Sequence, residues 1–252
     1  GVARINKVNV WYKTYIVELM YPEPDIAIIA SSVVFLDKKK LFAKKIIKQQ
    51  KQIIKKENMN MSISLVKGQK VDLTKGNDGL KNVVFGLGWD TNKYDGNAPF
   101  DLDVSAFLTD ANGKVTGEQD FIFYNQPCHP SGAIVYSGDN RTGEGAGDDE
   151  TMKVELNKIP SNIEKISFAA AIYNAEDRLQ NFGMVSNSYI RAYDADTNEE
   201  LFKYELDEDF SLETGIVAGE LYRKNGEWKF NAIGCGYNDG FVAIAKNFGL
   251  NV

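Results

Sequence analysis

From residue 82 onward, short apolar runs alternate with polar turns. The runs are four to ten residues long and rich in β-branched and aromatic residues. Such runs favour strands over helices. They begin at residues 82, 101, 120, 133, 152, 165, 187, 200, 215 and 227. About ten strands, with almost no helical pattern between them, predict an all-β fold, specifically a β-sandwich.

Local signals add detail to this prediction. Asn225-Gly226 lies between two strong apolar runs, which is the best hairpin signal in the chain. In the run that begins at Asp101, strand alternation places Asp101 and Asp103 side by side on one face. The opposite face would carry Leu102, Val104, Ala106 and Leu108. A short C-terminal helix is also expected, because one helical face would carry Phe241, Ile244, Ala245 and Phe248.

Residues 1–60 differ in charge from the rest. They hold 12 Lys+Arg and 5 Asp+Glu, a balance of +7, whereas the whole chain has a net charge of −6, which leaves −13 for residues 61–252. We therefore predict a basic N-terminal extension, residues 1–60, before a β-sandwich domain, residues 61–252. A domain of −13 would repel nucleic acid and attract divalent cations.

The extension itself allows three interpretations. Its apolar run at residues 26–36 is too short to span a bilayer as a helix. The lysine-rich segment that follows has apolar residues at roughly helical spacing, which suits peripheral association with an anionic membrane through residues 38–56. A solvated helix or a disordered tail fits the same residues. A third hypothesis is that residues 1–60 include translated sequence upstream of a start at Met59 or Met61.

Acidic residues gather in two places that could hold a metal ion. Asp101 and Asp103 would repel each other unless a positive charge lay between them, and Asp90 enters the same loop region. Residues 138–150, GDNRTGEGAGDDE, contain five acids and four glycines. Calcium takes six to eight oxygen ligands, which such a loop can supply. Neither stretch fits the spacing of an EF-hand, so a calcium site would combine separate loops.

The sequence lacks the residues that other metal sites, nucleotide-binding sites and catalytic sites require. The two cysteines, Cys128 and Cys235, have no metal-ligand spacing and suit a reducing, cytoplasmic setting. The single histidine, His129, is flanked by prolines in what we expect to be an exposed loop without a role. Gly86-Leu87-Gly88 lacks the third glycine of a dinucleotide fingerprint, and no P-loop occurs. We expect a protein that is not an enzyme.

Long motifs indicate a family. GWD, DLDVSAFL, FIFYNQ, SGDNRTGEGAGDDE and RLQNFGMVSNSYIRAYD occur in this order, and they resemble the TerD family of tellurium-resistance and general stress proteins. The resemblance covers residues 61–252 and none of the extension. It implies a calcium-binding β-sandwich that works with other stress or tellurium-resistance proteins. The implied calcium ligands are Asp90, Asp101, Asp103, Asp139, Asn140, Glu144, Asp148, Asp149 and Glu150. Two alternatives are a module that binds small molecules such as cyclic nucleotides and an acidic protein–protein scaffold.

Overall fold

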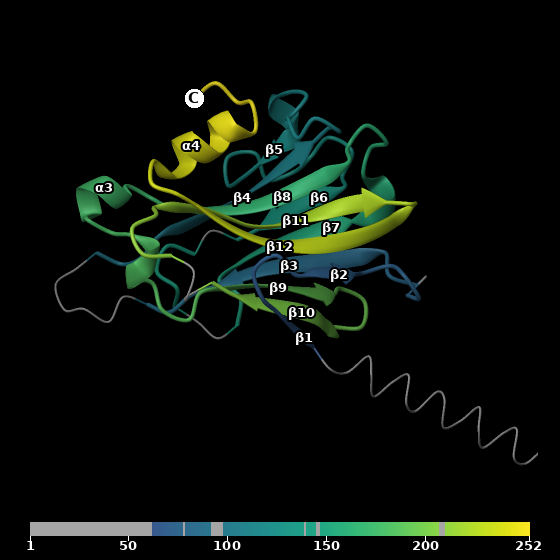
Figure 1. Ribbon diagram of the computed structural model, residues 1–252, viewed down its shortest axis with the longest axis horizontal. Helices are drawn as coiled ribbons and strands as arrows, with labels where there is room; N and C mark the ends of the chain where they lie inside the picture. Colours follow the sequence, from purple (N-terminus) through teal and green to yellow (C-terminus); the bar gives the residue numbers. More distant parts are fainter. Residues whose placement is uncertain (1–61, 78, 92–97, 139, 145–146, 207–209) are drawn as a thin grey trace, which may run out of the picture. The chain divides into compact units, whose positions relative to one another are not determined.

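The computed structural model describes residues 62–77, 79–91, 98–138, 140–144, 147–206 and 210–252. The basic N-terminal extension, its segment at residues 38–56 and the candidate ligand Asp139 lie outside these ranges. Within them, twelve strands form two six-stranded sheets that pack face to face (Figure 1). The predicted β-sandwich is confirmed. The strands beyond the expected ten are two short ones near the beginning of the described chain.

Each sheet is built from segments that are far apart in the sequence. The first sheet contains, in spatial order, β1 (Ile63–Leu65), β10 (Glu200–Glu205), β9 (Tyr189–Asp194), β3 (Asn82–Gly88), β7 (Glu150–Glu155) and β6 (Ile134–Ser137). The second contains β2 (Lys70–Asp72), β12 (Glu227–Tyr237), β11 (Gly215–Lys224), β8 (Lys165–Ile172), β4 (Leu102–Thr109) and β5 (Phe121–Ile122). Among these strands, only β1 and β10 pair in parallel.

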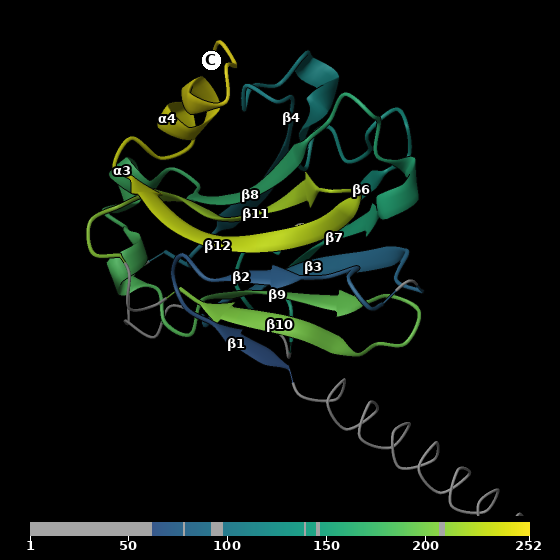
Figure 2. The same cartoon turned by 45° about the vertical axis from the view of Figure 1, so that its right-hand side comes forward.

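The alternation predicted for β4 sets up the core. Leu102, Val104, Ala106 and Leu108 are buried in the main apolar cluster between the sheets. Phe107, one residue out of phase, belongs to a second cluster on the outer face of the second sheet. The helix α4 (Gly240–Asn247) lies against the second sheet, as Figure 2 shows, and its Ile244 belongs to this second cluster. The rings of Phe107 and Phe248 stack with centroids 4.4 Å apart, so the predicted C-terminal helix and its apolar face are both confirmed.

The turn between β11 and β12 has the backbone that its sequence predicts. Asn225 and Gly226 both lie in the left-handed region, with φ of 56° and 79°. Two consecutive residues with positive φ define the turn type whose twist matches paired strands. Lys224 and Glu227 form the pair that closes the hairpin.

The prediction that His129 is exposed was wrong. His129 is only 6% exposed, and its Nε2 atom lies 3.1 Å from Oδ1 of Asp120. Asp120 is itself buried, and its other carboxylate oxygen accepts hydrogen bonds from the backbone N–H and the hydroxyl of Thr116. The flanking prolines do indicate a loop, but the local sequence cannot show that a buried carboxylate draws the imidazole inward.

Two further observations concern the setting of the protein. Cys128 and Cys235 are free thiols, and both are exposed. None of the helices in the described part of the chain has the length and apolar character needed to cross a membrane.

Candidate functional site

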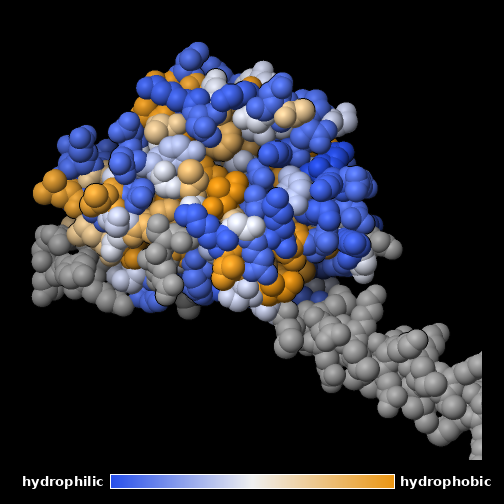
Figure 3. Space-filling model, in the orientation of Figure 1, coloured by the Kyte–Doolittle hydropathy of each residue, from blue (hydrophilic) through white to orange (hydrophobic). Residues whose placement is uncertain are grey.

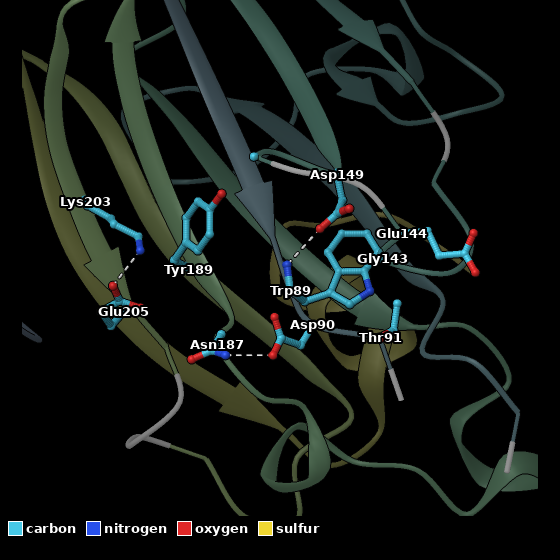
Figure 4. Close-up of a pocket in the computed structure, with 11 residues that line it drawn as sticks. Trp89, Asp90, Thr91, Gly143, Glu144, Asp149, Asn187, Tyr189, Lys203 and Glu205 are labelled. Carbon is cyan, nitrogen blue, oxygen red and sulfur yellow. Dashed lines mark hydrogen bonds and ion pairs between the residues drawn. The ribbon is translucent and has the colours of Figure 1, made fainter. Parts of the chain in front are cut away.

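An open cavity of about 580 Å³ lies where β3 and β10 end and β9 and β7 begin. Its lining includes the carboxylates of Asp90, Glu144, Asp149 and Glu205 and the ammonium group of Lys203 (Figure 4). We call it the acidic cavity. Three of the predicted metal ligands therefore line one site: Asp90 follows β3, and Glu144 and Asp149 come from the loop before β7.

Asp149 is the best-anchored carboxylate of the acidic cavity. Its Oδ2 accepts a hydrogen bond from the backbone N–H of Trp89 at 2.9 Å, and its Oδ1 accepts one from the amide of Asn140 at 2.7 Å. Burial raises the pKa of Asp149 above its usual value, and the negative charges of Asp148 and Asp90 raise it further. This carboxylate thus has hydrogen-bond donors beside it while neighbouring charges disfavour its ionised form.

The loop before Asp149 is folded by Asn140. The Oδ1 of Asn140 accepts hydrogen bonds from the backbone N–H groups of Thr142 and Gly143, each at 3.1 Å. Gly143 has a φ of +68°, and a Cβ there would lie 2.6 Å from the indole nitrogen of Trp89. Asn140 therefore organises the loop and orients Asp149. The carboxylate of Glu144, on the same loop, points away from Asp90 and Asp149 (Figure 4).

Asp90 is held from the opposite wall of the acidic cavity. Its backbone N–H donates to Ser186 O at 2.9 Å, and its Oδ2 accepts a hydrogen bond from the Asn187 amide at 2.7 Å. The turn that begins β9 is thereby tied to the end of β3.

Asp148 has a different environment from Asp149. Arg191 donates to both of its oxygens, from Nε at 2.6 Å and from Nη2 at 3.0 Å. Tyr189 donates its hydroxyl to the same carboxylate at 3.1 Å. Gly86 makes room for this arrangement, because a Cβ on Gly86 would lie 2.2 Å from Asp148 Cγ. The Gly86-Leu87-Gly88 sequence thus serves the packing of Asp148 and, at Gly88, of Tyr189.

Glu150 is buried between the sheets, with 1% of its surface exposed. Its Oε2 accepts a hydrogen bond from the backbone N–H of Val104 at 3.0 Å. Burial raises the pKa of Glu150 to about 8, and the charge of Asp103 acts in the same direction, while hydrogen bonds from Tyr136 and Val104 oppose the shift. Glu150 therefore links β7 to the beginning of β4 and does not line the acidic cavity.

The Asp101 and Asp103 side chains also lie outside the lining of the acidic cavity. Asp101 is 3.6 Å from the Arg178 guanidinium, and Asp103 lines a second concave region on the outer face of the second sheet. The two carboxylates that the sequence predicted to lie side by side therefore have different surroundings.

The oxygen ligands that line the acidic cavity are of the kind that a hard cation binds. Their arrangement, however, is not that of a complete metal site. Carboxylate and amide oxygens are the ligands that calcium takes. In the ranges that the structure describes, no group of three or more His, Cys, Asp or Glu side chains is arranged to hold a metal ion. The carboxylates that line the cavity would have to approach one another to share an ion.

Sequence reasoning missed several residues of this region. Tyr189, Arg191 and Asn187 all occur in the motif that carried the family resemblance, yet no role was predicted for them. Lys203 and Glu205 form an ion pair at 2.7 Å across the cavity wall, and the Lys203 ammonium lies 4.1 Å from the centre of the Tyr189 ring. Alternation in β9 and β10 places these side chains on the sheet, but only the pairing of distant strands brings them to the acidic loop.

The fold and the site define a class: a two-sheet β-sandwich with an acidic cavity built from loops at one end of a sheet. A family model described as the TerD domain matches residues 61–248. General stress protein 16U of Bacillus subtilis (strain 168) is 62% identical over 192 residues, which cover 76% of this chain and 100% of that protein. The chain belongs to the TerD family, as its motifs predicted.

Two further relatives agree with this assignment. Tellurium resistance protein TerD of Serratia marcescens is 50% identical over 191 residues, covering 76% of this chain and 99% of that protein. The crystal structure of a homologue of the telluride resistance protein TerD from Streptomyces coelicolor A3(2) superposes with a TM-score of 0.56 at 26% identity. That match covers 66% of this chain and 96% of the solved one.

Proposed function

We propose that this chain is a non-catalytic, calcium-binding protein that acts in a cytoplasmic stress response of the tellurium-resistance type. The observation that carries the proposal is the meeting of Asp90, Glu144 and Asp149 on one cavity of about 580 Å³. Carboxylates from separate loops repel one another when they are brought together, unless a cation offsets their charge.

Calcium suits this cavity better than other metals do. It accepts irregular sets of carboxylate, amide, backbone and water oxygens, whereas magnesium requires a tighter octahedron and retains its waters. Soft metals would require thiolate or imidazole ligands, and no Cys or His is among the described residues that line the cavity. Asp90 and Asp149 would hold the ion, and Glu144 would join them once its side chain turned toward the cavity. The ion would supply the positive charge that these residues lack. The loop at residues 140–144 would then be fixed to the end of β3.

Asp148 and Glu150 would support the site without binding calcium directly. Asp148 already shares both oxygens with Arg191, and Glu150 is directed at the backbone of Val104. Both would hold the ends of the acidic loop in place. This division narrows the nine ligands that the resemblance implied.

Among the described residues, Ser131, His129 and Asp120 resemble a catalytic triad, but their hydrogen bonds disfavour a catalytic role. The Ser131 hydroxyl lies 2.8 Å from His129 Nδ1, and Asp120 lies at the other ring nitrogen. However, the backbone N–H of Ser131 also donates to Nδ1, and the Ser131 hydroxyl accepts from the Ala133 N–H. These are the bonds of a closed turn, and we interpret the group as a structural clamp.

The stress-response part of the proposal is supported by the names of the relatives, which are a general stress protein and a tellurium resistance protein. The free thiols of Cys128 and Cys235 fit a reducing cytoplasm. In that setting, calcium-dependent closure of the acidic loop would present a defined surface to partner proteins.

Titration calorimetry of calcium into the metal-free full chain, with magnesium as the comparison, tests the site. We expect selective micromolar binding that weakens at least tenfold in Asp149→Asn and in Asp90→Asn. Glu118→Gln is a matched control, because Glu118 is exposed and does not line the cavity. If calcium bound only at millimolar concentrations, or if both Asn variants bound it like the wild type, the proposal would fail.

A further inference from the structure

A second concave region, of about 730 Å³, lies on the outer face of the second sheet. β4 and β8 contribute to its lining, as do α3 (Ala175–Arg178), the beginning of α4 and the segment after β5. Figure 3 shows apolar and hydrophilic surface intermixed over the face of the molecule that it draws. We call this region the aromatic cleft, because Phe121, Phe123, Tyr124, Tyr173 and Phe241 line it.

Several of these apolar side chains are exposed to solvent. Tyr124 is 44% exposed, Tyr173 45% and Val242 43%. Tyr124 packs edge-on against Phe123 with ring centroids 5.3 Å apart, so its position is set by a neighbouring ring. Exposed aromatic faces attract cations, particularly alkylammonium and guanidinium groups.

The charges in the aromatic cleft are all of one sign. Carboxylates of Asp103, Glu176, Asp177 and Asp239 line it, and no lysine or arginine is among its described lining residues. Across the described residues, no hydrogen bond or ion pair involves the carboxylates of Glu176, Asp177 or Asp239. Asp239 is the residue just before α4, and its side chain forms no capping hydrogen bond with the helix. Asp103 lies on β4, Glu176 and Asp177 lie on α3, and Asp239 comes just before α4, so the negative charge comes from three separate places in the fold.

The floor of the aromatic cleft carries a hydroxyl group that is not otherwise used. Ser105 is 5% exposed and lies on the outer face of β4, between Asp103 and Phe107 in the strand alternation. Within the described chain, its hydroxyl takes part in no hydrogen bond and is not among the fully enclosed unsatisfied atoms. It therefore remains available to a group that enters the cleft.

The protein already contains one cation bound in the manner that this surface favours. The Arg178 guanidinium carbon lies 5.2 Å from the centre of the Tyr173 ring, and the group is 3.6 Å from an Asp101 oxygen. An aromatic face together with a carboxylate thus holds an organic cation at the edge of the cleft.

We propose that the aromatic cleft binds a linear aliphatic polyamine. Two ammonium groups separated by methylene groups would reach carboxylates that come from different elements of the lining, while the methylene chain packs on the aromatic rings. The Ser105 hydroxyl would accept a hydrogen bond from the ammonium group nearest the floor. The volume lies within the range of about 300–1,000 Å³ that small-molecule sites occupy. A bare metal ion would leave the apolar walls in contact with water.

Calorimetric titration of the full chain with cadaverine at physiological salt tests this proposal. We expect saturable binding to one site, with little heat from pentanediol, the uncharged analogue of the same length. Magnesium in equal excess should not displace cadaverine. Asp239→Asn and Tyr124→Leu should each weaken binding about threefold to tenfold, the first by removing a charge and the second by replacing the ring with an apolar chain.

Controls separate this site from general attraction to an acidic protein. Glu118→Gln removes an exposed carboxylate outside the cleft and should leave cadaverine affinity unchanged. Ser105→Ala should weaken binding by a smaller factor than Asp239→Asn. The proposal is overturned if pentanediol binds as well as cadaverine, if magnesium displaces it, or if Glu118→Gln has the same effect as Asp239→Asn. All four positions are tested after thermal unfolding shows that the variants are folded.

Discussion

The acidic cavity and the aromatic cleft both attract cations, but their carboxylates have different surroundings. In the cavity, backbone N–H groups and amides fix the oxygens of Asp149 and Asp90 in place. In the cleft, the carboxylates of Glu176 and Asp239 are exposed, and aromatic rings lie beside them. Fixed oxygens suit a small inorganic ion, whereas exposed rings suit an organic one. The local environment, more than the number of acids, selects the cation.

The largest effect should come from Arg191→Met, which removes the partner of Asp148. The Asp148 side chain is 4% exposed, so its buried charge would lose its positive partner while it retains the hydrogen bond from the Tyr189 hydroxyl. We expect the free energy of unfolding to fall by about 3–5 kcal/mol in urea denaturation. The double variant with Asp148→Asn should recover part of this loss, and cadaverine affinity should not change. A loss below about 1 kcal/mol would instead make the pair equivalent to a surface ion pair.

Gly86→Ala, a substitution on β3, should also disturb the packing of Asp148. The new Cβ would lie 2.2 Å from Asp148 Cγ, so the loop would have to shift. We expect a loss of about 2 kcal/mol in unfolding free energy and weaker calcium binding. Gly79→Ala is the matched control, because its Cβ would have no atom nearer than 4.0 Å. Equal behaviour of the two variants would show that the loop adapts freely.

Glu150 should make the stability of the metal-free protein depend on pH. The pKa of Glu150 is about 8 in the folded chain and 4.5 for an unperturbed glutamate. Between these values the folded state holds a proton that the unfolded state has released, so stability falls as pH rises, by at most about 1.4 kcal/mol per pH unit. Glu150→Gln should flatten this slope in unfolding measurements across the window, whereas Asp239→Asn in the cleft should not. An unchanged slope in Glu150→Gln would assign the dependence to other groups.

The smallest effect is expected for Lys203→Met in the acidic cavity. Its ion pair with Glu205 is partly exposed, so the unfolding free energy should change by less than about 1 kcal/mol. Removing this positive charge should nevertheless tighten calcium binding about twofold, because the Lys203 ammonium group would no longer repel the calcium ion. Cadaverine affinity should stay the same. Weaker calcium binding in Lys203→Met would indicate that Lys203 positions the site.

The sequence predicted most of the fold because strands have a local signature. The alternation along β4, the Asn225-Gly226 turn and the apolar face of α4 all depend on residues close together in the chain. β1 and β2 were not predicted as separate strands, since each has three residues and is defined by pairing with β10 or β12. Tertiary pairing, which a short segment cannot encode alone, decides such elements.

The sequence predicted which segment contributes to the candidate site, but it did not predict the role of each residue in that segment. The motif around residues 138–150 pointed to a loop that lines the acidic cavity, but Asp148, Asp149 and Glu150 have three different environments. The difference depends on Arg191, Trp89 and Val104, which come from three other strands or their ends. The prediction that His129 is exposed was wrong for the same reason, because its partner Asp120 lies on a separate short helix, η1 (Glu118–Asp120).

The close approach of Gly86 to Asp148 limits how far the acidic loop could be transplanted into another protein. A graft of residues 138–150 onto a different β-sandwich would bring its carboxylates but not the bare strand surface on which Asp148 rests. The recipient would also need an arginine two strands away in the correct register. The loop is thus one part of a three-strand unit, and only that unit would be portable.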